Sequence, residues 1–464
     1  MYEISDGEVQ RKIGFQNPWW EEGRVDKYIR DWTPRAYLEL FYNILADKKV
    51  NRAVVLMGPR RVGKTVMIYH AIQKLINNGV KPENIIYISI DTPNYFGYSL
   101  EKLLALALEK RLKRGAKGLY VFFDEIQYLK DWEIHLKSLV DQYRGIKFVA
   151  SGSAAAALKL KSRESGAGRF TDFILPPLTF YEYLMFIDKM KLAENPKYIK
   201  ALNKEFINYL NYGGYPEALF SEDIQRDPGR YIRSDIIDKV LLRDLPGLYG
   251  INDIQELNRL FVALARNTAN EISLKELSKN SGVKKPTIRR YIQYLEAAFL
   301  IKRLPRIDKR AKKFKRAVRF KVHLTNPSMH CALFGPVDEN SENIGSLVET
   351  AIFSQLLHSP FVNDIYYARW DKGEIDLVLM MGRKLDFCIE VKWSDSTINN
   401  PNRLKEFVSF AKTFKVQNNI VTTRTILRSS SIEEVDVYFS PASVECYSHG
   451  KISFEVISPD GYLL

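Results

Sequence analysis

The sequence has little cysteine, no long apolar run and no segment typical of export. Its three cysteines, Cys331, Cys388 and Cys446, are too few and too scattered for a disulfide framework or a zinc site. No apolar run approaches the roughly 18 residues of a membrane-spanning helix. The N-terminal segment Met1–Asp6 is acidic and lacks the apolar core of a signal peptide. These absences predict a cytoplasmic protein without membrane contacts.

Charge is unbalanced toward lysine and arginine. The 464 residues carry a formal net charge of +14, although 46% apolar and 27% charged residues are typical of a soluble globular protein. Excess positive charge favours a polyanionic partner, and nucleic acid is the usual one inside cells. A lysine-rich surface that serves solubility or thermal stability is the alternative. The length predicts about three domains.

Residues 58–65 have the spacing G-x-x-x-x-G-K-T of a phosphate-binding P-loop. The motif comprises Gly58, Pro59, Arg60, Arg61, Val62, Gly63, Lys64 and Thr65. An apolar strand at 52–57 precedes it and a helix follows it, which is the order that the motif requires. Backbone N–H groups and the helix dipole would bind phosphate, Lys64 would reach the β- and γ-phosphates, and Thr65 would ligate Mg²⁺. The sequence therefore predicts ATP and Mg²⁺ as cofactors; a chance glycine-rich turn is the alternative.

Two adjacent acids end the apolar strand expected at 119–125. Asp124 would hold Mg²⁺ through water, and Glu125 would polarise the attacking water. Two solvated acids in a loop are the alternative. Ser151 and Ser153 follow the next expected strand and are candidates to contact the γ-phosphate or the water, although serines there are also common turn formers.

The chain alternates between α/β and helical segments. Alternating strands and helices predict a parallel sheet. Before it, the tryptophans Trp19, Trp20 and Trp32 predict an N-terminal arm that packs onto the next domain; an exposed contact surface is the alternative. The expected parts are an arm at 1–50, a P-loop core at 51–175, a helical region at 176–249, a winged helix with a basic segment at 250–325 and an α/β domain at 341–464.

Residues 250–305 have the spacing of a helix-turn-helix. A capping box at Ser273 and Glu276 opens one helix, and Pro286 starts the next. Basic residues begin that second helix and continue beyond it: Lys284, Lys285, Arg289, Arg290, Lys302, Arg303, Arg306, Lys309, Arg310, Lys312, Lys313, Lys315 and Arg316. They would place the second helix in the major groove of DNA and neutralise phosphates. A protein-binding winged helix with a solvated charge run is the alternative.

Acidic residues recur at strand spacing in the C-terminal part. Asp376 lies on one expected strand, and Glu390 and Lys392 lie on the next, with their side chains on one face. With a three-residue hairpin loop at 382–384, Asp376 falls opposite Glu390. Two facing carboxylates favour a divalent metal between them, with Lys392 on the attacking water or the phosphate.

Glu349, on a helix expected at 344–358, is the predicted fourth member of this group. A helix acid, a strand acid and Glu-x-Lys in this order are typical of restriction-endonuclease-like nucleases. In the same register Glu374 would face Lys392, so a plain cross-strand ion pair is the alternative. A nuclease-like fold that does not cut is also open.

Several motifs together resemble a known family. They are Gly58–Thr65, Asp124–Gln127, Gly168-Arg169, Leu178–Glu182 and Gly213–Glu217. In this order they resemble the archaeal and bacterial AAA-type ATPases that carry a C-terminal nuclease-like domain, over nearly the whole chain. The resemblance implies a P-loop core, a helical lid at 176–249, a winged helix and a variable C-terminal domain.

The resemblance also assigns a role to Arg169, as an arginine finger or sensor acting in cis or from a neighbouring subunit. An ordinary surface arginine is the alternative. The sequence departs from the family at Asn326, where relatives usually have aspartate.

We predict a multidomain α/β protein that is an Mg²⁺-dependent ATPase and couples hydrolysis to nucleic acid, with DNA the first expectation. Nuclease activity at the C-terminal acids and assembly into a homo-oligomer are left open. Two other functions stay open as well. One is a nucleotide-controlled switch or scaffold whose C-terminal domain only binds, and the other is a DNA-binding regulator that acts through its basic stretch.

Overall fold

The chain divides into two compact units, Met1–Leu175 and Pro176–Leu464. A computed structural model describes residues 5–47, 49–109, 118–152, 168–313, 319–358, 362–382 and 384–455. The division falls where the sequence places the end of the P-loop core. Within the described ranges, no helix combines the length and the apolar character that a membrane span needs.

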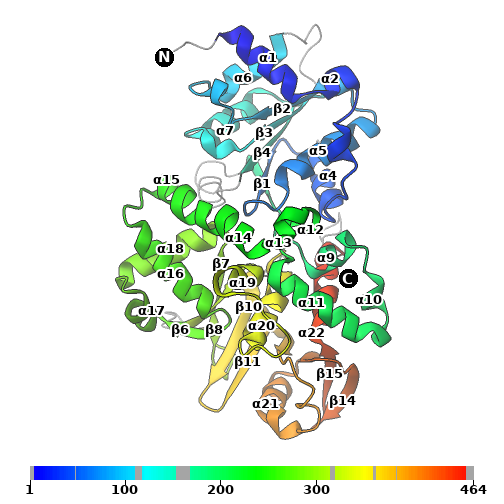
Figure 1. Ribbon diagram of the computed structural model, residues 1–464, viewed down its shortest axis with the longest axis vertical. Helices are drawn as coiled ribbons and strands as arrows, with labels where there is room; N and C mark the ends of the chain where they lie inside the picture. The colour runs from blue at the N-terminus through cyan, green and yellow to red at the C-terminus, as the bar shows by residue number, and fades with distance from the viewer. Residues whose placement is uncertain are drawn as a thin grey trace. The chain divides into compact units, whose positions relative to one another are not determined.

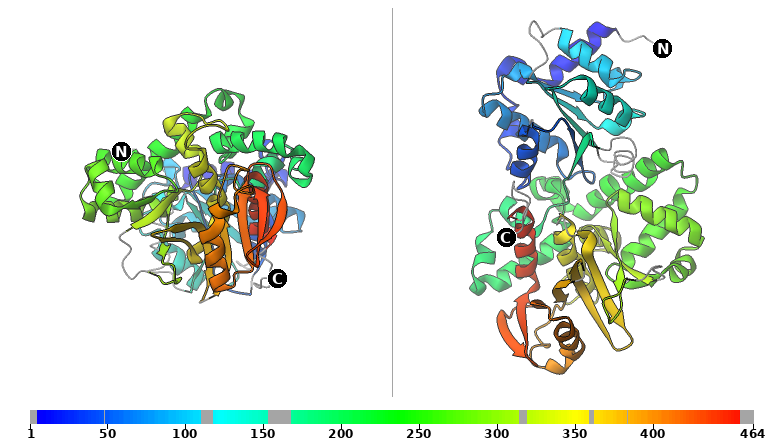
Figure 2. Two further views of the ribbon diagram at one scale, coloured as in Figure 1. Left: turned by 90° about the horizontal axis from the view of Figure 1, so that it is seen from below. Right: turned by 180° about the vertical axis from the view of Figure 1, so that it is seen from behind.

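The first unit is a five-stranded parallel sheet with helices on both faces (Figure 1). The strand order is β2-β3-β4-β1-β5, formed by Ile85–Ser89, Tyr120–Asp124, Lys147–Gly152, Ala53–Met57 and Phe170–Ile174. The central strands β1, β3 and β4 are buried along their whole length, as a parallel sheet covered on both faces requires. Helices α4 (Leu38–Ala46) and α5 (Lys64–Asn77) cover one face, and α6 (Leu100–Glu109) and α7 (Trp132–Gln142) cover the other (Figures 1 and 2).

The N-terminal arm belongs to this unit and covers the edge of β2. It carries α1 (Asp6–Gln16), α2 (Trp19–Glu22) and α3 (Lys27–Arg30) ahead of α4. The Asn17 side chain accepts the Tyr87 N–H at 2.7 Å and donates to the Tyr87 carbonyl at 2.8 Å, as a neighbouring strand would. Trp19 is fully buried, whereas Trp32 is 42% exposed. The predicted packing is therefore confirmed for Trp19 and wrong for Trp32.

The second unit opens with helices and a small antiparallel sheet. Helices α9 (Phe180–Phe186) and α11 (Ile199–Tyr212) are followed by π-helical turns at Ile232–Asp238 and Val240–Asp244. Next come α16 (Ile254–Arg266), β6 (Glu271–Ser273), α17 (Leu274–Ser281), α18 (Lys285–Ala297), β7 (Ile301–Leu304) and β9 (Arg319–Leu324). The strands pair in the order β6-β9-β7. The capping box expected at Ser273 and Glu276 is present and opens α17.

A mixed seven-stranded sheet forms the rest of the unit. Its order is β14-β15-β13-β12-β11-β10-β8, formed by Arg428–Ile432, Val435–Pro441, Asn418–Thr423, Lys384–Glu390, Gly373–Met381, Ile365–Trp370 and Arg306–Ile307. Helices α19 (Ser328–Phe334), α20 (Ile344–Gln355), α21 (Lys405–Phe414) and α22 (Ala442–Glu455) complete it. The short strand β8 follows β7 after one residue, so the chain passes directly from the small sheet into the large one.

The helices expected to form a lid share a hydrophobic core with the C-terminal sheet. Phe180 and Tyr209, on α9 and α11, lie in one buried cluster with Leu347 of α20, Ile389 of β12 and Cys446 of α22. The opposite face of the sheet is covered by α21 in a second cluster. The buried residues between Leu178 and Leu219 therefore share their core with the C-terminal sheet. A local sequence pattern does not reveal this, because the partner residues are far along the chain.

The β11–β12 hairpin has a different loop from the predicted one. Met381 pairs with Lys384, so the three-residue loop at 382–384 was wrong. A β-bulge between Leu379 and Met380 then shifts the pairing by one residue, and Leu377 faces Ile389. Continued by one residue, that register sets Asp376 opposite Glu390. Because of the bulge, Asp376 and Glu390 lie opposite each other as predicted, although the predicted loop was wrong.

Candidate functional site

The P-loop connects β1 to α5 in a tightly packed turn. A Cβ atom on Gly58 would lie 2.0 Å from the Leu175 carbonyl oxygen, so only glycine fits there. Arg61 and Gly63 have φ angles of 61° and 89°, in the left-handed region. The Lys64 side chain folds back over the loop and donates to the carbonyl oxygens of Gly58 and Pro59 at 3.1 and 2.7 Å.

Asp124 lies at the end of β3, with three hydroxyl groups directed at its carboxylate. Thr65 Oγ1 and Tyr87 Oη each donate to Asp124 Oδ2 at 2.8 Å, and Ser151 Oγ donates to Oδ1. Strand β4 lies between β1 and β3, which places Ser151 beside the P-loop. The structure thus brings Thr65, Asp124 and Ser151 together, whereas Ser153 lies outside the described residues. Carboxylate and hydroxyl oxygens are ligands that Mg²⁺ accepts, so this donor set fits the ion.

Glu125 occupies a strained position next to Asp124. Its φ angle of 52° lies in the left-handed region, which is uncommon for glutamate and recurs at functional sites. The side-chain amide of Gln127 donates to Glu125 Oε2. Burial, only partly offset by nearby Lys64, raises the pKa of Glu125 above its usual range. A carboxylate with a raised pKa is a better proton acceptor than an exposed one.

Two residues near this site carry no motif and were missed from sequence. Tyr87, on β2, reaches Asp124 across the sheet. Arg35, on the N-terminal arm, is 5% exposed and donates from Nη1 to the Val62 carbonyl at 2.6 Å, which anchors the P-loop backbone. Neither contact has a local signal, because the partners lie 37 and 27 positions apart.

Arg169 lies at the opposite end of the sheet from its own P-loop. It precedes β5, which runs parallel to β1 with Ala53 facing Phe170, while the P-loop follows the other end of β1. Its Nε atom is 2.5 Å from Asp141 Oδ1, and its carbonyl accepts the Ala53 N–H. This placement contradicts a finger or sensor role in cis. Action from a neighbouring subunit stays a prediction.

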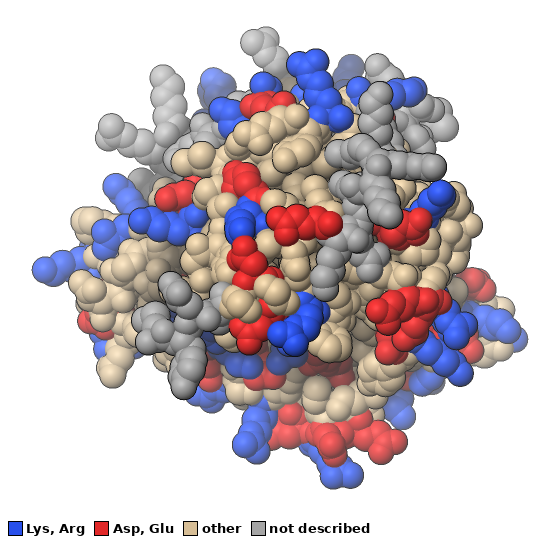
Figure 3. Space-filling view, turned by 90° about the horizontal axis from the view of Figure 1, so that it is seen from above, with Lys and Arg blue, Asp and Glu red and all other residues tan. Residues whose placement is uncertain are grey.

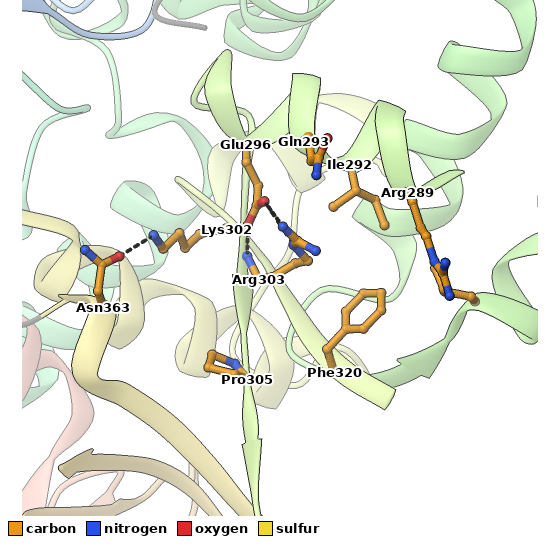
Figure 4. A pocket seen from close by; sticks show the side chains of 10 residues that line it. Arg289, Ile292, Gln293, Glu296, Lys302, Arg303, Pro305, Phe320 and Asn363 are labelled. Atoms are coloured by element: carbon orange, nitrogen blue, oxygen red, sulfur yellow. Dashed lines mark hydrogen bonds and ion pairs between the residues drawn. The ribbon is translucent and has the colours of Figure 1, made fainter. Parts of the chain in front are cut away.

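Helix α18 presents a basic face. Lys284, Lys285, Arg289 and Arg290 are exposed at its N-terminal half. Beside it is a cavity of about 390 Å³, shown in Figure 4, which lies between α18, β7 and β9. Arg289 and Gln293 line this cavity from the helix, and Lys302 lines it from β7.

The basic segment after α18 is only partly directed to solvent. Arg303 donates to Glu296 through Nε and Nη2 at 2.9 and 2.6 Å, and Arg306 bonds the Arg369 carbonyl and Glu271. Both side chains therefore serve the fold, against their predicted use as phosphate contacts. Lys309, Arg310, Lys312 and Lys313 are exposed, while Lys315 and Arg316 lie outside the described residues. On the face shown in Figure 3, positive and negative side chains are interspersed.

The four residues of the predicted nuclease centre do come together. Glu349 and Asp376 both bond one ammonium group, the Val391 N–H donates to Asp376 Oδ2 at 2.9 Å, and Lys392 Nζ lies 2.7 Å from Glu390 Oε1. The alternative ion pair between Glu374 and Lys392 is not formed. Glu374 pairs with Lys321 at 2.8 Å and with Arg369 at 2.9 Å, and Lys392 pairs with Glu390.

The ammonium group inside this cluster belongs to Lys321 of β9. Its side chain is 2% exposed, and Nζ lies 2.9 Å from Glu349, 3.0 Å from Asp376 and 2.8 Å from Glu374. Burial opposes the charged form, but the carboxylates outweigh it and raise the pKa of Lys321 well above its usual range. Burial, then Asp376, raises the pKa of Glu349, whereas Lys321 and Lys392 overcome burial and lower the pKa of Asp376.

A divalent metal does not fit the cluster in this arrangement. Two of its expected carboxylates already bond the Lys321 ammonium, and a second cation, Lys392, compensates Glu390. Within the described part of the chain, no three histidine, cysteine, aspartate or glutamate side chains are grouped so that they could hold a metal ion. The prediction of Asp376 and Glu390 as metal ligands therefore fails here on charge, because sequence reasoning did not include Lys321.

Comparison with known proteins divides the chain into three matches. The family model described as "AAA domain" matches residues 50–184, and two domains of unknown function match 203–340 and 344–440. An uncharacterized protein of Methanocaldococcus jannaschii is 25% identical over 79% of this chain and 79% of its own length. One from Haemophilus influenzae is 23% identical over 83% of this chain and 92% of its own.

Solved structures give only distant similarity. The Hsp104:casein complex of S. cerevisiae aligns over 57% of this chain and 50% of that chain, with 15% identity and a TM-score of 0.29. Residues 50–184, with their P-loop, their parallel sheet and their family match, are an AAA-type P-loop ATPase domain.

Proposed function

We propose that the protein is an Mg²⁺-dependent ATPase that couples ATP hydrolysis to nucleic-acid binding. The observation that carries the ATPase is the convergence of Thr65, Tyr87 and Ser151 on Asp124. Beside them is a P-loop whose Lys64 ammonium rests on two loop carbonyls. Such a preorganised, buried carboxylate has no evident structural purpose that a neutral residue would not serve better. Oligomer formation and the cytoplasmic location stay predictions.

Each residue of the proposed nucleotide site has a distinct role. The N–H groups at the start of α5 bind phosphate, and Lys64 leaves its two loop carbonyls to bond the terminal phosphates. Thr65 and Asp124 would hold Mg²⁺, which when bound neutralises phosphate charge. Glu125 accepts a hydrogen bond from the attacking water and orients it, while Gln127 fixes the Glu125 carboxylate.

The ATPase is tested by phosphate release from the purified full chain with ATP and Mg²⁺. Lys64→Ala should lower the rate by about 100-fold, because it removes the charge that stabilises the developing phosphate charge. Lys74→Ala is the matched control: it lies on the same helix and pairs with Glu39 at the surface, so its rate should equal that of the wild type. Equal release from all three proteins would identify the activity as a contaminant.

Tyr87 is proposed to position Asp124 for the metal. Tyr87→Phe removes one charge-assisted hydrogen bond, so the Mg²⁺ concentration at half-maximal rate should rise roughly tenfold while the KM for ATP at saturating Mg²⁺ changes little. Tyr95→Phe is the control, since its hydroxyl bonds Gln16 rather than Asp124. If the two variants have the same Mg²⁺ dependence, Tyr87 has only a packing role.

The nucleic-acid part of the proposal rests on residues 250–325. Helix α16, strand β6, helices α17 and α18 and strands β7 and β9 follow one another, apart from the short β8, which pairs with β10 of the other sheet. With the pairing β6-β9-β7, this is the topology expected for a winged helix, with α18 as its second helix. The exposed cations of α18 would contact phosphates or base edges. DNA is the nucleic acid that we propose it binds.

The affinity for DNA should depend less steeply on salt when two of these cations are removed. For Arg289→Ala with Arg290→Ala, the slope of log affinity against log salt should fall by about 2, because two phosphate contacts are lost. Lys275→Ala with Lys279→Ala, on α17, removes the same charge and should leave the slope unchanged. Fluorescence anisotropy of a labelled duplex measures both. Equal changes of the slope in the two double variants would show that α18 contributes only general electrostatic attraction and no specific phosphate contacts.

A nucleotide-controlled switch with a non-catalytic C-terminal domain is the second candidate function. The observation that favours it is the Lys321 ammonium among the predicted nuclease acids. The order helix α20, strands β10, β11 and β12, helix α21 and strand β13 is that of a nuclease-like fold. We therefore propose that fold for residues 341–464, with binding and no cleavage.

A further inference from the structure

The Lys321 ammonium is the centre of a buried, charge-balanced network. It bonds Glu349 from α20, and Glu374 and Asp376 from β11, at 2.8–3.0 Å. Three donors and three carboxylate partners satisfy all the N–H bonds that an ammonium group can make. Lys321 itself comes from β9, a strand of the small sheet.

The network continues from Lys321 into the small sheet. Glu374 also pairs with Arg369 of β10, and Arg369 lies 3.9 Å from Glu271 of β6. Glu271 in turn accepts bonds from Arg306 at 3.3 Å, from Arg319 at 3.1 Å and from the Tyr367 hydroxyl at 2.9 Å. The Glu271 side chain is only 4% exposed, whereas its cationic partners Arg306, Arg319 and Arg369 are partly exposed.

We propose that Lys321 is a built-in cation that takes the place of a divalent metal and holds the small sheet rigidly against the C-terminal sheet. An ammonium group bonded to the same carboxylates excludes a metal by charge and by space. Removing a metal does not loosen such a joint, so the small sheet stays attached to α20 and β11 under all metal conditions. The Thr268 and Thr350 hydroxyls, 2.8 Å apart, add a second contact between the same two parts.

The inference predicts where Mn²⁺ binds and where it does not. In electron paramagnetic resonance titrations of the nucleotide-free full chain, the wild type and Asp376→Asn should bind equal amounts of Mn²⁺. Subtraction of the two cancels any ion held near the P-loop. A bound Mn²⁺ that the wild type has and Asp376→Asn lacks would overturn the proposal.

A second variant tests whether ammonium and metal are exchangeable. Lys321→Ser opens the position while keeping the carboxylates, and should bind one additional Mn²⁺ that is lost again when Asp376→Asn is added. Lys312→Ser removes an exposed lysine nearby and should gain none. A folded Lys321→Ser chain without the additional ion would contradict the exchange. If Lys321→Ser does not fold, the comparison of the wild type with Asp376→Asn still decides the proposal.

This test is separate from that of the ATPase. Phosphate release depends on Lys64, whereas Mn²⁺ binding at the cluster depends on Asp376 and Lys321, so either result can fail alone. DNA cleavage adds a further readout: with Mn²⁺ and plasmid, the wild type and Lys392→Ala should cut equally little. Cutting that Lys392→Ala abolishes would restore the nuclease.

Discussion

Glu125→Gln should retain ATP and almost stop splitting it. The expected fall in turnover is about 100-fold or more, because the amide cannot accept the proton of the attacking water. The affinity for ATP should stay within about threefold of the wild type, since the phosphates are held by the P-loop and by Lys64. Steady-state phosphate release and equilibrium binding of a labelled nucleotide measure the two quantities separately.

The physical basis is the environment of Glu125. Its pKa is raised by burial, its carboxylate is held by Gln127, and its backbone is strained, so little reorganisation is needed when water binds. Glu83→Gln, an exposed acid before β2 in the same unit, is the control and should leave both quantities unchanged. If Glu125→Gln turns over ATP at more than about a third of the wild-type rate, another group is the base.

Lys321→Met should destabilise the second unit more than any surface substitution. It leaves two buried carboxylates and Glu374 without their common cation, and the expected loss is about 3–5 kcal/mol of unfolding free energy. For a unit of this size the unfolding midpoint should fall by roughly 5–15 °C. Thermal unfolding followed by circular dichroism measures it.

Two controls separate lost charge compensation from lost packing. Lys312→Met changes an exposed lysine and should leave the midpoint within about 1 °C. Adding Glu349→Gln and Asp376→Asn to Lys321→Met removes the uncompensated charges and should recover part of the loss. A Lys321→Met protein as stable as the wild type would show that the network is dispensable.

Local patterns sufficed to place the residues of the proposed nucleotide site. The P-loop spacing, the apolar strand that ends in Asp124 and the serine near the end of β4 are all readable within a few residues, and the parallel sheet joins them at one edge. Tyr87 and Arg35 could not be found this way, since their contacts depend on the packing of β2 and of the N-terminal arm. Arg169 was placed by resemblance alone, and the strand direction of β5 puts it at the far edge.

The C-terminal cluster shows more clearly what local sequence patterns cannot predict. Strand periodicity was enough to bring Asp376 and Glu390 together, even with the wrong hairpin loop, because a bulge corrects the register. The cation between the acids was not foreseen, because Lys321 is 55 residues from Asp376 along the chain and reads as the end of a basic run. A motif predicts the acidic residues of a site. The charge balance of that site also depends on residues that are distant in the sequence and that the fold brings close, such as Lys321.

In the proposed function, one chain joins ATP turnover to nucleic-acid binding. The most direct test is the affinity of Glu125→Gln for duplex DNA, measured by anisotropy with Mg²⁺ and saturating ATP and again without nucleotide. Coupling predicts a difference of about fivefold or more between the two affinities. Equal affinities, with ATP shown to be bound, would contradict the claim and leave an ATPase and a DNA-binding unit that act independently.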